Sequence, residues 1–185
     1  RAHRARHACT FAAVDRPGHQ EVRFHRLGTD PRKDEIIRQK TGDPRTFTGG
    51  ALSRDGHWLF YTIARGSRST DVWFRDMRNP RKPAPWQELA VGRPAIYQVS
   101  AWKDRFYIHT DDGAPGYRVL RADPRRPARE HWREIVPERS GETLTGMRIV
   151  GNRLSLGYLK NVASRIEVRE LDGKWVREMD LPDVG

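Results

Sequence analysis

The stretch that decides the fold reads Leu52-Ser53-Arg54-Asp55-Gly56-His57-Trp58-Leu59-Phe60-Tyr61-Thr62-Ile63. Its apolar ends flank a short polar turn built around Asp55-Gly56. An Asp-Gly pair tolerates the positive φ angles that tight turns between antiparallel strands require. The stretch therefore predicts a β-hairpin.

The same pattern occurs twice more, at residues 99–109 and 147–158. Trp58, Phe106 and Leu154 occupy the same position in the three hairpins, at a constant spacing of 48 residues. A fixed period of this size is the mark of a repeat architecture, in which each unit buries its faces against its neighbours. The chain is therefore predicted to be an array of similar β units.

Two further strands are predicted after each hairpin. The third strand alternates apolar and charged residues, as a half-buried strand does, and the fourth begins with Trp. Pro-rich connectors separate the two, because proline removes a donor from the strand ladder. The third strands are predicted at 71–76, 117–123 and 165–171, and the fourth at 86–89, 132–135 and 175–178. Residues 21–27 and 34–38 resemble the third and fourth strands of an earlier unit.

Four strands per repeat are typical of β-propeller blades. We predict an all-β fold, a partial propeller over 21–185 with about three complete four-stranded blades and two strands of a preceding blade. The complete blades are expected at 48–91, 95–137 and 144–181, and the blade fragment at 21–40. A β-sandwich of about fourteen strands is the alternative, but sandwich strands need no fixed period. Because this number of blades does not close a ring, we expect an incomplete chain or one that pairs with another copy or segment.

Residues 1–20 are left unassigned and are expected to be disordered or to come from a misread start. They have no Met at position 1 and no apolar segment of a secretory signal. The single cysteine, Cys9, forms no internal disulfide, which fits a reducing compartment. The expected location is the cytoplasm, with the periplasm as the alternative. His3, His7 and Cys9 lack a fourth ligand, so no metal site is predicted.

The chain is basic, with 35 Lys and Arg against 24 Asp and Glu and a formal net charge of +11. Basic residues are interleaved with acidic ones along the whole chain, as at residues 165–170. This spread predicts a solvated basic surface, so no nucleic-acid partner is expected. A basic nucleic-acid-binding β protein is the least favoured alternative. No apolar run of eighteen residues is present, so no membrane partner is expected either.

Four strings resemble those of the propeller domain of prolyl oligopeptidases, which are serine peptidases that cut after proline. The resemblance covers roughly residues 20 to 185 and rests on the order of the strings as well as their content. The strings are Val22-Arg23-Phe24-His25-Arg26-Leu27-Gly28-Thr29-Asp30, His109-Thr110-Asp111-Asp112-Gly113-Ala114-Pro115-Gly116-Tyr117-Arg118-Val119, Trp132-Arg133-Glu134-Ile135-Val136-Pro137-Glu138 and Tyr158-Leu159-Lys160-Asn161.

The resemblance implies a non-catalytic role. In that family a seven-bladed propeller covers an α/β-hydrolase domain and restricts the active site to short peptides. The expected partners are therefore the missing blades, the catalytic domain and short proline-containing peptides, with no cofactor. The alternative is a stand-alone scaffold that binds proteins through its blade loops.

The residues themselves predict no catalysis by this chain alone. A Ser-His-Asp enzyme of the α/β-hydrolase type needs a G-x-S-x-G elbow, and none is present. His25, His57 and His109 lie in predicted strands or at their ends. We assign them structural or surface roles and predict no catalytic residue.

Two substrate-binding positions follow from the resemblance alone. Matching by sequence places the propeller's contribution to the wall of the peptide pocket at Phe47 and Ser67. An aromatic side chain suits an apolar wall, whereas relatives tend to carry Cys or an aromatic residue at the position of Ser67. The alternatives are that Phe47 belongs to ordinary blade packing and that Ser67 is merely a loop residue.

Overall fold

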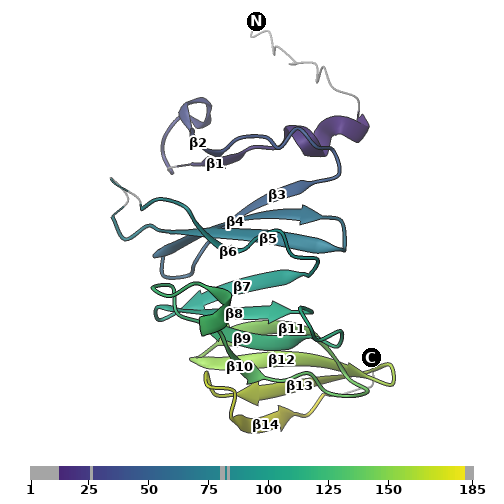
Figure 1. The fold of residues 1–185 in the computed structure, drawn as a ribbon. Coiled ribbons are helices and arrows are strands. Elements are labelled where there is room, and N and C mark those ends of the chain that lie inside the picture. The colour runs from purple at the N-terminus through teal and green to yellow at the C-terminus, as the bar shows by residue number, and fades with distance from the viewer. Residues whose placement is uncertain (1–12, 26, 80–81, 83, 182–185) are drawn as a thin grey trace, which may run out of the picture.

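A computed structural model describes residues 13–25, 27–79, 82 and 84–181 of the chain. Within these residues there are three four-stranded antiparallel sheets and one two-stranded sheet, and each strand pairs with its neighbour in sequence (Figure 1). Consecutive sheets are stacked along the molecule in chain order. This is the arrangement of propeller blades, and it confirms the predicted fold. His3, His7 and Cys9 lie outside the described residues.

All fourteen predicted strands are present. The blade fragment consists of β1 (Val22–Phe24) and β2 (Glu35–Arg38). The first blade consists of β3 (Phe47–Leu52), β4 (Trp58–Arg65), β5 (Ser69–Asp76) and β6 (Gln87–Ala90). The second consists of β7 (Tyr97–Trp102), β8 (Arg105–Thr110), β9 (Arg118–Ala122) and β10 (Arg133–Val136). The third consists of β11 (Thr143–Val150), β12 (Arg153–Lys160), β13 (Ala163–Arg169) and β14 (Trp175–Met179).

Three short 3-10 helices accompany the strands: η1 (Ala13–His19), η2 (Pro31–Lys33) and η3 (Arg129–His131). Helix η1 lies within the stretch 1–20, for which the sequence predicted no structure. Its Gly18 touches the next segment so closely that an added Cβ would lie 2.9 Å from the backbone of Asp43. Helix η1 therefore contacts the segment between β2 and β3.

The hairpin turns have the backbone that the sequence predicted. Gly56 has φ of 74°, and Lys103, Asp104 and Asn152 have φ of 47°, 54° and 65° at the equivalent turns. These residues hold the left-handed conformation that tight antiparallel turns require.

The second blade buries its two faces against different neighbours. In β8, Phe106 and Ile108 belong to the apolar cluster shared with the first blade. Tyr107, between them in sequence, belongs to the cluster shared with the third blade. Because successive side chains of a strand point to opposite faces, one strand contributes to two cores.

The repeated position identified from the sequence lies at the centre of the first core. The ring of Phe106 is in edge-to-face contact with Trp58, Phe60 and Phe74, at centroid distances of 5.2, 5.0 and 4.9 Å. Leu154 occupies the equivalent position in the third blade and is fully buried. Phe106 and Leu154 each face the preceding blade, whereas Trp58 packs toward the following one.

A backbone hydrogen bond recurs between consecutive blades. Each joins a residue in or before one unit's strands to the segment that leads into or begins the next blade, and the donor lies on the earlier unit only in the Thr70 pair. The pairs are Gly42 N–H to Gly18 O at 2.9 Å, Thr70 N–H to Ala95 O at 3.0 Å and Leu144 N–H to Gly116 O at 2.9 Å.

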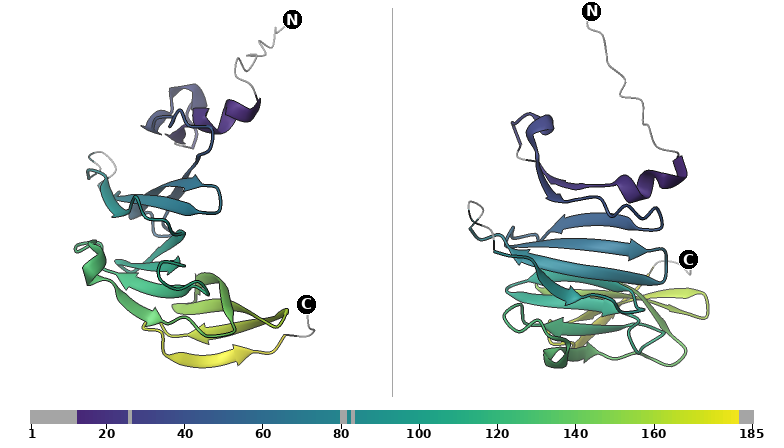
Figure 2. Two further views of the ribbon diagram at one scale, coloured as in Figure 1. Left: turned by 45° about the vertical axis from the view of Figure 1, so that its right-hand side comes forward. Right: turned by 45° about the horizontal axis from the view of Figure 1, so that its top comes forward.

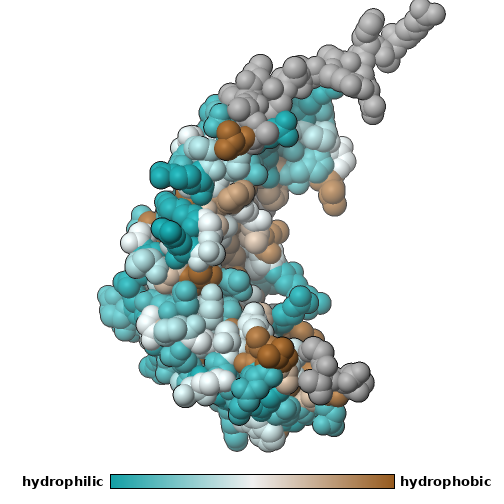
Figure 3. Space-filling view, turned by 90° about the vertical axis from the view of Figure 1, so that its right-hand side faces the viewer, coloured by the Kyte–Doolittle hydropathy of each residue, from teal (hydrophilic) through white to brown (hydrophobic). Residues whose placement is uncertain are grey.

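The stack of blades is curved. Figure 2 shows an arc running from η1 to β14. In Figure 3, seen from the end at which β4 turns into β5, the arc is hollow on one side and apolar side chains gather there. The chain thus forms a sector of a ring.

Candidate functional site

The first strands of the three blades share one groove. A hollow of about 260 Å³ is lined from β3 by Ala51 and Leu52, from β7 by Val99 and Ala101, and from β11 by Ile149. In a closed propeller the first strands surround the central channel. This groove is therefore part of the channel wall.

Phe47 begins β3 and pairs with Ala64 at the end of β4. Its side chain is 52% exposed and belongs to neither apolar core. Its predicted role as a pocket wall stays a prediction, since no bound peptide is present.

Ser67 lies in the exposed turn between β4 and β5. Antiparallel pairing places this turn at the same end of the first blade as Phe47. The turn is tied down by an ion pair between Arg65 and the buried Asp71, which also accepts a hydrogen bond from the Gly92 N–H at 2.8 Å. The two predicted residues thus share one blade end, and the substrate role of Ser67 also stays a prediction.

One Ser, Asp and His do meet, in the β3–β4 turn. The Ser53 hydroxyl donates to Asp55 at 2.6 Å, and the His57 Nδ1 lies 3.4 Å from the other carboxylate oxygen of Asp55. Burial raises the pKa of Asp55, but hydrogen bonds from Ser53 and the His57 N–H outweigh it and lower the pKa overall. In a catalytic triad His must bridge Ser and Asp. Here Asp is the bridge, so the trio stabilises a turn and activates no nucleophile.

His109 is a structural residue, as the sequence predicted. It is buried on β8, and its Nε2 lies 2.8 Å from the Leu144 carbonyl oxygen of the next blade. Its ring stacks on Tyr117 at 4.7 Å. Burial lowers the pKa of the imidazole, which favours the neutral form as a fixed link between blades. His25 pairs with Asp34 at 2.9 Å on the blade fragment.

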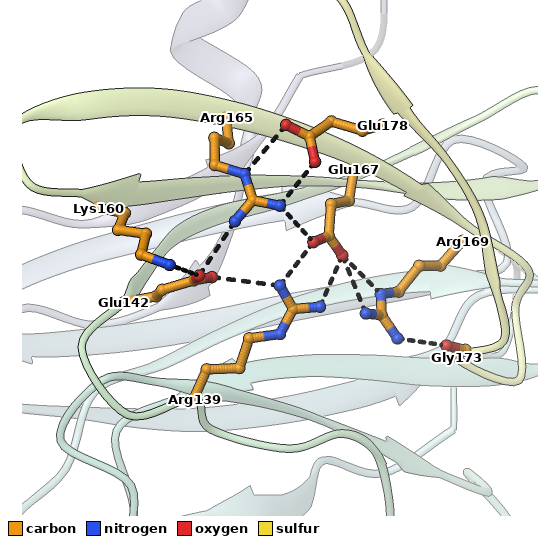
Figure 4. Close-up of polar contacts among 8 residues, drawn as sticks. All are labelled: Arg139, Glu142, Lys160, Arg165, Glu167, Arg169, Gly173 and Glu178. Carbon is orange, nitrogen blue, oxygen red and sulfur yellow. Dashed lines mark hydrogen bonds and ion pairs between the residues drawn. The ribbon is translucent and has the colours of Figure 1, made fainter.

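The most extensive charged cluster was missed by the sequence reasoning. It lies on the third blade and in the connector that leads to it (Figure 4). We call it the Glu167 cluster, and it comprises Arg139, Glu142, Lys160, Arg165, Glu167, Arg169 and Glu178. It joins β12, β13 and β14 to the segment that leaves the second blade, so it links separate elements of the fold.

Glu167 is the centre of this cluster, with a side chain only 2% exposed. Arg139 donates two hydrogen bonds to it, at 2.5 and 2.8 Å, and Arg169 donates at 2.9 and 3.1 Å. Burial raises the pKa of Glu167, but the bonds from Arg139 and Arg169 outweigh it and lower the pKa. The carboxylate is therefore held ionised, as a buried charge must be when it is paired. Because Arg139 and Glu167 are 28 residues apart in the sequence, the cluster can be recognised only from the folded structure.

The described residues contain no group of three or more His, Cys, Asp or Glu side chains arranged to hold a metal ion. Among the same residues, no helix is long and apolar enough to cross a membrane.

The blade architecture and the strings quoted above agree with a family model. The model of the prolyl oligopeptidase N-terminal β-propeller domain matches residues 5–185. The chain belongs to this family. The match starts at residue 5 and so includes much of the stretch that the sequence analysis left unassigned.

Curated prolyl oligopeptidases extend well beyond the part that this chain matches. The prolyl endopeptidase of Elizabethkingia miricola is 28% identical over 168 residues, which is 89% of this chain and 23% of the relative. Prolyl oligopeptidase A of Amanita bisporigera is 24% identical over 169 residues, 89% of this chain and 22% of the relative. The chain spans about a quarter of the length of these relatives.

Solved structures show the same relationship. One, from a study of two prolyl endopeptidases and their inter-domain dynamics, has a TM-score of 0.90 and 45% identity, and covers 97% of this chain and 26% of that one. The apo form of prolyl oligopeptidase B from Galerina marginata has a TM-score of 0.77 at 21% identity, over 89% of this chain and 24% of that one, and supports the fold alone. The prolyl-oligopeptidase propeller predicted from the sequence is thus confirmed.

Proposed function

We propose that this chain is a non-catalytic section of the propeller of a serine peptidase that cuts short peptides after proline. The observation that carries the proposal is the match of nearly the whole arc, at a TM-score of 0.90 and 45% identity, to part of a prolyl endopeptidase. In this proposal the chain forms part of the wall of the propeller channel. A triad held by an α/β-hydrolase domain brings the chemistry.

The packing of the blades supports a role as a rigid wall. Each blade shares an apolar core with the next, and buried groups such as His109 and Glu167 link them by hydrogen bonds. A wall of this kind excludes bulky substrates and bulk water from a covered active site, which strengthens electrostatic stabilisation inside it.

The wall also contributes to substrate binding in this proposal. Phe47 presents an exposed aromatic ring at the blade end that carries the turn of Ser67. An apolar ring at a channel mouth gains affinity by burying a peptide side chain. Ser67 adds little apolar area, so Phe47 is the stronger of the two contacts.

Reading the encoding DNA downstream of residue 185 tests the assignment. Further blades followed by an α/β domain with a G-x-S-x-G elbow support it. A stop codon directly after residue 185, with no such domain encoded beyond it, contradicts it.

The substrate role can be tested in a chimera in which residues 21–181 of this chain replace the matching blades of a related prolyl endopeptidase. The chimera is expected to cleave a short Gly-Pro reporter, and Phe47→Ala in it to raise KM about tenfold with kcat little changed. The exposed Phe47 is compared with Val150→Ala, which removes an exposed apolar side chain at the end of β11. Equal effects of the two substitutions contradict a specific contact at Phe47.

A further inference from the structure

A basic pocket lies on the second blade, in a place that the proposed function does not use. It has a volume of about 270 Å³ and is lined by Arg105, Arg121, Ala122, Asp123, Arg126, His131 and Arg133. Four guanidinium groups thus face a single carboxylate. The pocket is at the end of the sheet where β8 and β10 begin, and Phe47 lies at the opposite end of the first blade.

The strand pairing brings like charges together. Arg121 on β9 stands directly opposite Arg133 on β10, and Tyr107 on β8 is its partner on the other side. Arg105 lies two residues before Tyr107, on the same face of β8. Directly opposed like charges destabilise a sheet, and an anion placed between them removes that cost.

The repeat shows that the blade fold does not require these arginines. At the place of Arg121 the third blade has Val168, and the first has Phe74, whose ring packs on Phe106 at 4.9 Å. The equivalent pocket of the third blade is lined by Val150, Val168 and Met179 and has only two arginines, Arg153 and Arg177. Among the three complete blades the second alone brings four arginines to this place.

The loop that closes the pocket is held in shape without any ligand. Residues Asp123 and Arg126 pair across it, and the Arg125 N–H donates to the Asp123 carboxylate at 3.0 Å. At its far end the buried Trp132 donates its indole N–H to the Pro127 carbonyl at 2.7 Å. The arginines are therefore presented from a fixed frame, which lowers the entropy lost on binding.

Arginine side chains line the pocket both from the strands and from the loop between β9 and β10. Arg126 donates to His131 Nδ1 at 3.3 Å, which leaves other guanidinium N–H groups available. Arg105 is 3.4 Å from Asp123 and remains 44% exposed. Planar guanidinium groups match the oxygen pairs of phosphoryl groups, which makes arginine the preferred residue for binding them.

We propose that this pocket binds a small diphosphate or polyphosphate. One phosphoryl group bridges Arg121 and Arg133, and the next lies toward Arg105 and Arg126. The volume suits two linked phosphoryl groups, and the charge of four arginines against one aspartate suits a ligand with several negative charges. The site is independent of peptide binding, so failure of the peptidase assignment leaves it unaffected.

Calorimetric titration of the full chain with inorganic pyrophosphate, at fixed ionic strength, tests the proposal. Saturable one-site binding with a dissociation constant below about 1 mM is expected. Arg133→Gln should weaken it about tenfold. Arg125→Gln, which removes a neighbouring charge that does not line the pocket, should weaken it less than about twofold. Equal losses in the two variants, or no binding to the parent chain, overturn the proposal.

Two further arms sharpen the result. If ATP binds as tightly as pyrophosphate, the pocket recognises the diphosphate itself. If ATP binds more tightly, the ligand is a nucleotide. Either result supports a polyphosphate site. Orthophosphate binding as tightly as pyrophosphate contradicts it. In buffer without polyvalent anions, Arg133→Gln should melt at a temperature no lower than the parent, because it removes a like-charge pair. A lower melting temperature shows that Arg133 serves stability and overturns the proposal.

Discussion

The Nε2 of His109, on the second strand of the second blade, lies 2.8 Å from the carbonyl oxygen of Leu144 on the first strand of the third. Leu144 also donates its N–H to the Gly116 carbonyl at 2.9 Å. Both residues are buried. The two blades are therefore joined by polar links that become unsatisfied if either partner is lost.

His109→Gln is expected to lower the free energy of unfolding by about 1–3 kcal/mol, because it disturbs a buried hydrogen bond. Urea unfolding measures the change. His131→Gln, at an exposed histidine of the same blade, is the control and should change little. Equal losses in both variants contradict the assigned link.

The same residue predicts a pH dependence. Burial lowers the pKa of His109 below its ordinary value of 6.5. The unfolded chain then binds more protons than the folded chain as pH falls below 6.5, so stability falls until the folded pKa is reached. His109→Gln should flatten the stability profile in this window. An unchanged slope between neutral pH and about pH 5 contradicts the prediction.

Glu167→Gln is expected to lower the free energy of unfolding by about 3–5 kcal/mol, because it leaves arginines without their carboxylate in a mostly buried cluster. Glu88→Gln, on an exposed position of β6, is the control. The lowered pKa of Glu167 adds an acid dependence: its contribution is present above the ordinary value of 4.5 and is lost as pH falls through the folded pKa. Thermal melts of the parent and both variants between neutral and acid pH measure both effects.

Arg38 joins the blade fragment to the first blade. Its guanidinium lies over the rings of Tyr61, Trp73 and Trp86, at 5.1, 5.7 and 4.8 Å from their centroids. Arg38→Gln should cost about 1–2 kcal/mol and change the tryptophan emission. Arg32→Gln, at an exposed arginine of the fragment, should do neither. If Arg38→Gln changes neither the stability nor the emission, the contacts of Arg38 with the three rings contribute nothing to stability.

Gly173 lies where the third blade closely approaches the second. It has φ of 93°, and a Cβ there would overlap the Ile135 backbone. Gly173→Ala should destabilise by about 2–4 kcal/mol, through backbone strain and overpacking together. Gly66 has φ of 59° and open space around it. Gly66→Ala therefore isolates the strain alone, at about 1 kcal/mol, and equal losses at both sites would show that the close approach is unimportant.

The fold was predictable because its determinants are local. The turns at Asp55-Gly56 and Asn152, the alternation in β13 and the equivalent apolar positions of Phe106 and Leu154 are all visible in the sequence. Pairing between consecutive strands then fixes each blade.

The charged sites were not predictable in the same way. Arg139 and Glu167 are 28 residues apart, and only the stacking of blades brings them together. The even spread of charge along the chain predicted a solvated surface, yet Arg105, Arg121 and Arg133 meet in one pocket. Strand register, which sets which charges face each other, is a tertiary property. For Phe47 and Ser67 the resemblance supplied the role and the structure supplied only their common position.

The most direct test of the central claim is a peptidase assay on the purified chain. A Gly-Pro reporter peptide is incubated with the chain, with a full-length prolyl endopeptidase as the positive control. A channel wall without a triad should release no reporter above the buffer rate. Turnover by the chain that a serine-reactive inhibitor abolishes would contradict the account.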